Sequence, residues 1–79
     1  MNMQVQLLGT QGCHLCEQAH ALLQSFVFEG LQVELVDIMD DPVWLNAYAL
    51  SIPVLRRVDS NTELAWPFSV LQIAHFLEK

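Results

Sequence analysis

The sequence predicts a single α/β domain over residues 1–79, with a four-stranded mixed sheet and helices on both faces. Three observations lead to this prediction. Apolar residues recur at strand and helix periods in the order β-α-β-α-β-β-α. The first helical segment lies between two strand segments, as in a right-handed crossover between parallel strands. A short turn joins the third and fourth strand segments, which indicates an antiparallel hairpin on the opposite edge of the sheet.

The first three elements follow from changes in apolar period. Residues 3–8 form a short apolar run typical of a buried strand, and residues 9–12 form a loop with two glycines. Residues 31–36 alternate, which predicts a second strand whose buried face carries Leu31, Val33 and Leu35. A helix is predicted between this loop and Gly30, a residue type that typically ends helices. Its apolar residues recur at helical spacing: Leu15, Ala19, Leu22, Leu23, Phe26 and Val27.

The second helix is predicted from its first residues. Asp41 is a typical N-cap, and Pro42 suits the first helical position because it lacks an amide hydrogen there. The run 51–53, Ser-Ile-Pro, ends this helix. The residues available for packing are Val43, Trp44, Ala47, Tyr48 and Leu50.

The last three elements are two strands and a helix. Residues 54–58 and 62–66 read as strands, and the turn at 59–61 makes them a hairpin. Pro67 ends the fourth strand. Residues 69–78 have apolar side chains at helical spacing, which predicts a closing helix packed through Val70, Ile73, Ala74 and Leu77.

Composition excludes several function classes. The net charge is −6, with nine acidic and only three basic residues, Arg56, Arg57 and Lys79. So acidic a chain is unsuited to nucleic acid or to an anionic membrane surface. No apolar run reaches the roughly 20 residues that span a bilayer. The N-terminal residues lack the basic and apolar regions of a secretory signal, so we expect a cytoplasmic protein. We also expect a monomer.

The two cysteines, Cys13 and Cys16, carry the chemistry that the sequence predicts. They stand three residues apart where a loop becomes a helix. There the sulfur of Cys13 faces unpaired amides, which favour its thiolate and lower its pKa below the free value of about 8.5. Cys13 is therefore the expected nucleophile, and Cys16, one turn on and more buried, the expected resolving thiol. Two buried structural cysteines are the alternative.

A metal site is the main chemical alternative to a redox dithiol. The two thiolates are half of a tetrahedral zinc site, and no second cysteine pair exists to complete it. His20, one turn beyond Cys16, is a candidate third ligand, with a partner chain supplying the fourth. A non-enzymatic interaction module, whose dithiol is a redox-sensitive contact or metal clip, is the corresponding alternative function. We expect no bound metal.

Other side chains admit two interpretations each. His14, when protonated, would stabilise a thiolate at Cys13, or is an ordinary exposed histidine in a first helical turn. Tyr48 and Trp66 either line a groove around Cys13 or belong to the core. Arg56 and Arg57 point to opposite faces of their strand. Either one of them binds an anion or both lie at a solvated strand edge, and we expect the strand edge. Core positions are expected for Trp44 and Phe26, and surface or boundary positions for His20 and His75.

The order of elements and three segments resemble the thioredoxin fold, and most closely the small bacterial glutaredoxin-like proteins. The resemblance covers nearly the whole chain. Together with the cysteine pair, an Ile-Pro about 37 residues later in a βαβ context is a specific combination. The segments are Cys13-His14-Leu15-Cys16, the run from Tyr48 to Ile52-Pro53-Val54-Leu55, and Trp66-Pro67-Phe68 after the hairpin.

The resemblance implies a thiol–disulfide oxidoreductase that reduces protein disulfides or glutathione mixed disulfides. It also implies a cis peptide bond before Pro53, beside the cysteines. It implies no bound cofactor, with glutathione or a reductase as the electron source. The residues expected to meet the substrate, besides the catalytic Cys13 and Cys16, are His14, Leu15, Ile52, Pro53, Trp66 and Pro67.

Two features of glutaredoxins that hold glutathione are missing here. Glutaredoxins usually carry a lysine shortly before the first cysteine, where this chain has Thr10 and Gln11. They also carry a Gly-Gly turn and an acidic residue before the last helix, where this chain reads Trp-Pro-Phe-Ser over residues 66–69. The resemblance therefore supports dithiol chemistry better than it supports glutathione as the partner.

Overall fold

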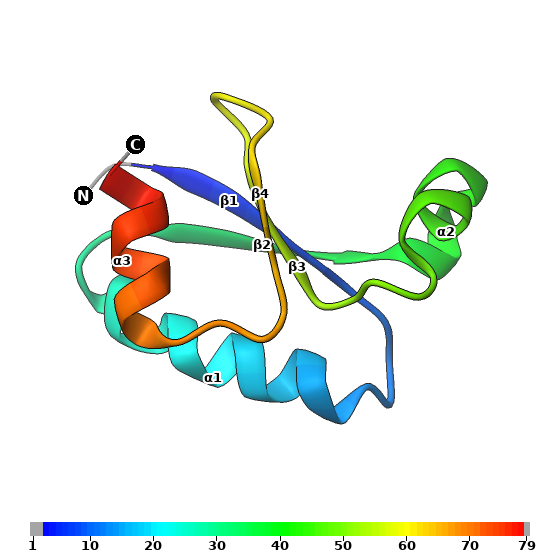
Figure 1. Cartoon of the computed structure of the whole chain (residues 1–79), viewed down its shortest axis with the longest axis horizontal. Coiled ribbons are helices and arrows are strands. Elements are labelled where there is room, and N and C mark those ends of the chain that lie inside the picture. The colour runs from blue at the N-terminus through cyan, green and yellow to red at the C-terminus, as the bar shows by residue number, and fades with distance from the viewer. Residues whose placement is uncertain (1–2, 79) are drawn as a thin grey trace.

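A computed structural model describes residues 3–78 and has the predicted order β-α-β-α-β-β-α, with one short 3₁₀ helix added (Figure 1). That helix, η1, follows the second strand directly and was not predicted. Among these residues no helix is long and apolar enough to cross a membrane. The elements are β1 (Gln4–Gly9), α1 (His14–Phe28), β2 (Gln32–Asp37), η1 (Ile38–Asp40), α2 (Pro42–Tyr48), β3 (Val54–Arg57), β4 (Glu63–Ala65) and α3 (Val70–Glu78).

The four strands form one mixed sheet in the order β2-β1-β3-β4. β1 and β2 are parallel, and their register ends with Gly9 beside Asp37. β3 is antiparallel to both β1 and β4, and its first residue, Val54, lies opposite Leu8. The loop after β1, the end of β2 and the loop before β3 therefore meet at one end of the sheet.

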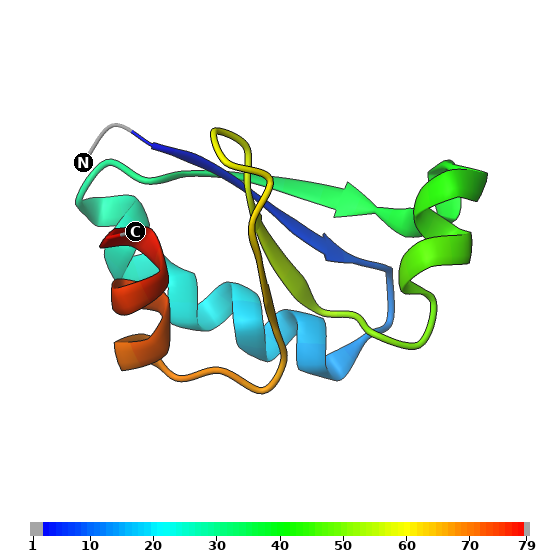
Figure 2. The same ribbon diagram turned by 45° about the horizontal axis from the view of Figure 1, so that its top comes forward.

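Helices pack on both faces of the sheet, as predicted, although α2 contacts its face only at one end. Successive residues of a strand point to opposite faces, so Leu7 and Leu8 enter different apolar clusters. α1 and α3 lie on the Leu7 side, whereas α2 lies at one end of the sheet (Figure 2). The Leu7 side holds the larger core: Val5, Leu7, Ala19, Leu23, Phe26, Leu31, Leu55, Phe68, Ile73, Phe76 and Leu77. The Leu8 side holds Leu8, Ile38 and Val54, packed by Val36, Trp44, Leu45, Tyr48 and Ile52.

The helices begin where local side chains satisfy their first amides. The Asp41 carboxylate accepts a hydrogen bond from the amide of Val43 at 2.8 Å, and Pro42 is the first helical residue of α2, as predicted. α3 starts with a reciprocal pair: Ser69 Oγ accepts from the Gln72 amide at 3.2 Å, and Gln72 Oε1 accepts from the Ser69 amide at 2.8 Å. This capping box satisfies two amides that would otherwise lack partners in the helix.

Several residues expected to pack in the core are exposed: Val27, Leu35, Val43, Ala47, Leu50 and Val70. Leu35 of β2 is 60% exposed and Val27 of α1 is 40% exposed. β2 is an edge strand, and near its carboxyl end the space beside Leu35 is a groove rather than core. Val27 lies in the last turn of α1, just before the chain turns at Gly30, whose φ is 105°.

The expectation of a solvated strand edge at Arg56 and Arg57 is wrong for Arg57. β3 is an interior strand, and the Arg57 side chain points towards the end of α3, where the residue is only 6% exposed. Its guanidinium donates to the Asp59 carboxylate at 2.7 and 3.0 Å and to the carbonyl of Phe76 at 3.1 Å. A cation that binds the last carbonyls of a helix stabilises that end. Arg57 thus links the carboxyl end of α3 to β3 through hydrogen bonds.

We expect the Arg57–Asp59 pair to make stability depend on pH in acid. The hydrogen bonds from Arg57 lower the pKa of the Asp59 carboxyl below its ordinary value of 3.8. Because the folded-state pKa is the lower one, the stabilisation is fully present above the unfolded value and is lost as the pH falls through the folded value. Asp59→Asn should therefore be less stable than wild type in urea at neutral pH, and the difference should shrink at an acid pH below 3.8. A difference that is the same at both pH values would contradict this role.

Candidate active site at the start of helix α1

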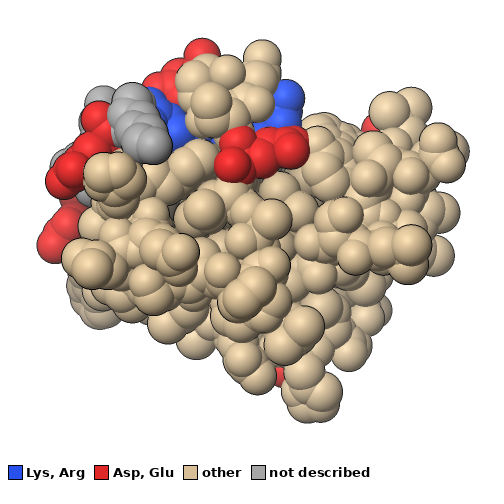
Figure 3. Space-filling model, viewed as in Figure 1, with Lys and Arg blue, Asp and Glu red and all other residues tan. Residues whose placement is uncertain are grey.

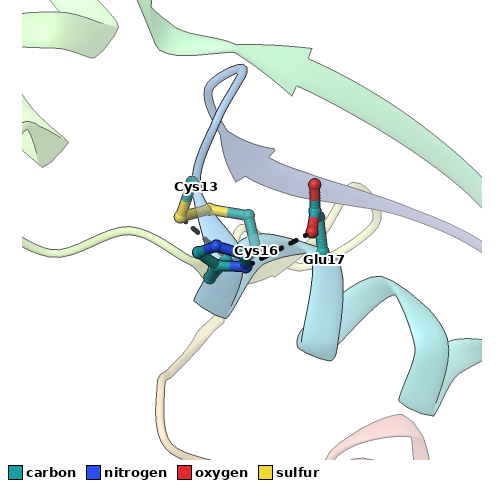
Figure 4. The surroundings of a disulfide bond; sticks show 4 residues. Cys13, Cys16 and Glu17 are labelled. Carbon is teal, nitrogen blue, oxygen red and sulfur yellow. Dashed lines mark hydrogen bonds and ion pairs between the residues drawn. A yellow bond between two sulfur atoms is a disulfide. The ribbon is translucent and has the colours of Figure 1, made fainter.

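Cys13 and Cys16 form a disulfide at the start of α1 (Figure 4). Cys13 is the N-cap residue, one position before the first helical residue, and its backbone is extended. Its Sγ accepts a hydrogen bond from the amide of Cys16 at 3.2 Å. The two Cα atoms lie 5.2 Å apart, within the range that a disulfide spans.

The position of Cys13 determines its chemistry once the disulfide is reduced. The first amides of a helix have no intrahelical acceptor and carry the positive end of the helix dipole. A thiolate accepts hydrogen bonds from them more strongly than a thiol does, so the pKa of a thiol at this place falls. The side chain of Cys13 is half-buried, whereas Cys16 is 9% exposed. Cys13 is thus the thiol that an outside molecule reaches more easily.

Gly9, the last residue of β1, lets Cys16 pack against the sheet. A Cβ added at Gly9 would lie 2.9 Å from Cys16 Sγ and 3.2 Å from its Cβ. A real Cβ essentially never lies as close as 2.9 Å to another atom, so a side chain at this position would force Cys16 to shift. Because Leu8 lies opposite Val54 in β3, Gly9 also adjoins the loop that ends at Pro53. Cys16 therefore lies at the junction of β1, α1 and the loop before β3.

We expect Gly9→Ala to displace Cys16 and to slow closure of the disulfide. The added methyl forces the start of α1 away from the sheet and should lower the free energy of unfolding by about 1–3 kcal/mol. Gly30→Ala is the control, since its positive φ of 105° costs about 1 kcal/mol at the other end of α1. Stopped-flow oxidation of the reduced protein should be slower only in Gly9→Ala. Equal closure rates in the two variants would contradict the contact.

A groove of about 450 Å³ lies beside the disulfide, between the start of α1 and the carboxyl ends of β1 and β2. The sequence suggested a groove around Cys13, but it did not indicate the residues that line this one. The signal in the sequence was the parallel pairing expected for the first two strands. This pairing places Asp37 beside Gly9, the residue just before the loop that leads to Cys13. The lining residues are Leu7, Gly9, Thr10, Gln11, Gly12, Cys13, Cys16, Glu17, His20, Leu35, Val36 and Asp37.

The six residues expected to meet the substrate lie outside this groove. His14 and Leu15 are exposed in the first turn of α1, and Pro67 is exposed after β4. The peptide bonds before Pro53 and before Pro67 are both cis. The other three residues are buried or half-buried: Ile52, Pro53 and Trp66. Their contact with a substrate stays a prediction.

Tyr48 and Trp66 do not line the groove. Tyr48 belongs to α2, and its hydroxyl donates to the Glu63 carboxylate. That hydrogen bond raises the pKa of Tyr48 above its ordinary value, with burial and the charge of Glu63 adding to the effect. Trp66 packs against the larger core, edge-on to Phe68 with 5.0 Å between the ring centres. The Trp66 amide donates to the Pro53 carbonyl at 3.2 Å, which ties the loop before α3 to the loop before β3.

The histidines near the cysteines lie on the outside of the helix. The His14 side chain is 92% exposed, with Nδ1 3.7 Å from Glu17 Oε2. His20 is half-buried and lines the groove one turn beyond Cys16. Within residues 3–78, no three His, Cys, Asp or Glu side chains gather closely enough to hold a metal ion.

Comparisons with known proteins agree with this architecture. The family model described as glutaredoxin-like domain (DUF836) matches residues 4–78. The X-ray structure of XcR50 from X. campestris is 35% identical in sequence, with a TM-score of 0.80, and the match covers 94% of this chain and 95% of that one. No curated protein matches the chain closely enough to indicate a relationship.

More distant structures share the fold. The solution structure of Ne2328 from Nitrosomonas europaea has a TM-score of 0.81 at 24% identity, covering 96% of this chain and 92% of that one. Thioredoxin 1 from Thermosipho africanus TCF52B has a TM-score of 0.63 at 15% identity, covering 96% and 91%. The fold is therefore that of the thioredoxins, as the order of elements predicted.

Proposed function

The chain belongs to the glutaredoxin-like domain family (DUF836), and on that premise we propose that it is a thiol–disulfide oxidoreductase that reduces disulfides. The observation that carries the proposal is the Cys16 amide directed at Cys13 Sγ, 3.2 Å away, at the first turn of α1. A structural disulfide has no need of such a donor, whereas a nucleophilic thiolate is stabilised by one.

In the proposed reaction, the reduced protein transfers two electrons to a disulfide. The Cys13 thiolate attacks one substrate sulfur, forms a mixed disulfide and releases the other sulfur as a thiolate, which takes a proton from solvent. Cys16 then loses its proton to solvent and attacks Cys13 Sγ. The Cys13–Cys16 disulfide forms, and the second substrate sulfur leaves and is protonated.

The residues around the cysteines have distinct tasks in this proposal. The amide of Cys16 stabilises Cys13 as the thiolate, both when it attacks and when it leaves. Gly9 leaves room for the Cys16 side chain at the end of β1. The backbone of Ile52, before Pro53, pairs with the extended substrate chain in the manner of strand addition. The exposed His14 and Leu15, with Trp66 and Pro67, flank the bound substrate.

The proposed cycle needs no bound cofactor or metal. Glutathione or a reductase returns two electrons to the Cys13–Cys16 disulfide after each turnover. The substrate is a protein disulfide or a glutathione mixed disulfide. We place the reaction in the cytoplasm, where thiols are kept reduced and a two-cysteine pair is used for catalysis rather than for structure.

The test is turnover of a peptide disulfide, with dithiothreitol as the electron source and wild-type protein at catalytic concentration. Many equivalents of substrate should be reduced per protein molecule, faster than by dithiothreitol alone. A stoichiometric reaction that stops after one equivalent, or a rate equal to the background, would contradict catalysis.

A further inference from the structure

The groove beside the disulfide borders the position that a substrate joined to Cys13 occupies. Cys13 and Cys16 line the groove. A substrate chain joined to Cys13 Sγ therefore extends either over the groove or away from it. One wall is the start of α1 and the other is the end of the β1–β2 pair. Leu35 lies on the second wall and is 60% exposed, so it gives the groove an apolar surface that is open to solvent. The residues next to the substrate cysteine thus have a surface to bind.

Two carboxylates face this groove from opposite walls. Glu17, in the first turn of α1, has a side chain that is 73% exposed and projects beside the disulfide (Figure 4). Asp37, at the end of β2, is half-buried, and its Oδ1 accepts a hydrogen bond from the amide of Met39 at 2.9 Å. No lysine or arginine lines the groove, and His20 is its one basic side chain. The groove therefore suits a positively charged group.

The arginines of residues 3–78 lie at the other end of the sheet. Arg56 and Arg57 pair with Gln6 and Val5 near the start of β1, whereas the cysteines follow its end. Glu63 and Asp59 each lie within ion-pair distance of one of these arginines. Figure 3 shows the arginine atoms gathered at the top of the view, among acidic atoms, above a broad surface with almost no charge. The carboxylates of glutathione thus meet no arginine at this groove.

We propose, on the basis of the proposed function, that the substrate is a disulfide in a protein segment with a lysine or arginine beside its cysteine. The cationic side chain lies in the groove between Glu17 and Asp37, and its methylene groups pack on Leu35. An ammonium or guanidinium group supplies the positive charge that both walls lack. An acidic segment, or glutathione with its net negative charge, is disfavoured by the same carboxylates.

The test compares three synthetic peptide disulfides that differ only in the residue after the cysteine: Lys, Gln or Glu. Reduced full-length protein is mixed with each peptide at low ionic strength and at about pH 8. We expect the lysine peptide to react about tenfold faster than the glutamate peptide, since each of the two carboxylates should change the lysine-to-glutamate rate ratio about threefold. Added salt should reduce this ratio.

Three variants distinguish the effect of the groove carboxylates on peptide preference from the effect of the protein's net charge. Glu17→Gln and Asp37→Asn should each lower the lysine-to-glutamate rate ratio about two- to threefold. The ratio is the measured quantity because a change in Cys13 reactivity affects all peptides equally. Glu78→Gln, at the end of α3 and outside the groove, changes the net charge by the same amount and should leave the ratio unchanged.

The outcomes distinguish this inference from the proposed function. Equal rates for the three peptides, or an equal effect of Glu78→Gln, would overturn the inference and leave the oxidoreductase intact. Failure to reduce even the neutral glutamine peptide would instead overturn the proposed function.

Discussion

Cys13→Ser is expected to abolish disulfide reduction, by about three orders of magnitude or more, because it removes the attacking sulfur. Cys16 cannot replace it, since this thiol is buried against Gly9 at the end of β1. The fold should be unchanged, as serine at an N-cap also accepts a hydrogen bond from the first amides of the helix. The measurement is turnover of a peptide disulfide, with circular dichroism as the check on folding.

Cys16→Ser is the matched variant, and we expect it to stop the reaction one step later. Its Cys13 still attacks, but no thiol releases the substrate, so a mixed disulfide accumulates on Cys13 and is visible by mass spectrometry. Full turnover in Cys13→Ser would show that Cys13 is not the nucleophile. Unchanged release of product in Cys16→Ser would show that Cys16 does not resolve the intermediate.

Leu55→Ala is expected to cause the largest loss of stability among the substitutions considered. Leu55 is 0% exposed in the interior strand β3, where it pairs with Leu7 and Leu64 beneath α1 and α3. Truncating a leucine in such a place costs about 3 kcal/mol through lost burial and the cavity left behind. A chain of this size has only about 4–12 kcal/mol in total. Urea unfolding should therefore show a much lower midpoint.

The matched control for this substitution is Leu35→Ala. The same atoms are removed from the edge strand β2, but Leu35 is 60% exposed, so the expected loss is below about 1 kcal/mol. Leu35→Ala should instead weaken the preference for peptides with a cationic residue beside the cysteine. Equal losses of stability in the two variants would contradict the assignment of Leu55 to the core and of Leu35 to the groove.

Most of the fold could be predicted because local signals and the apolar pattern agree. Asp41 and Pro42 fix the start of α2, and Gly30 the end of α1, through backbone preferences that act within a few residues. The crossover between β1 and β2 follows from chain order alone. Cys13 could be placed at a helix start because the apolar period changes there. These features depend on neighbours in the sequence.

The features that the sequence did not reveal depend on residues far apart in the chain. Leu35 alternates like a core residue, but it lies on the edge strand β2 beside the groove and is exposed. Arg57 is buried because α3 ends beside β3, and no local pattern predicts where a helix ends in space. The groove needs Asp37 and Glu17 brought together by the β1–β2 register. Specificity is therefore harder to predict than catalytic chemistry.

The most direct test of the whole account is the reactivity of Cys13 towards iodoacetamide as a function of pH, in the reduced protein, with the alkylated cysteine identified by mass spectrometry. If the amides at the start of α1 stabilise the thiolate, Cys13 titrates at least one pH unit below the value of a free thiol, about 8.5. It then also reacts faster than a free thiol near pH 6. A Cys13 that titrates at or above the free value would contradict the account.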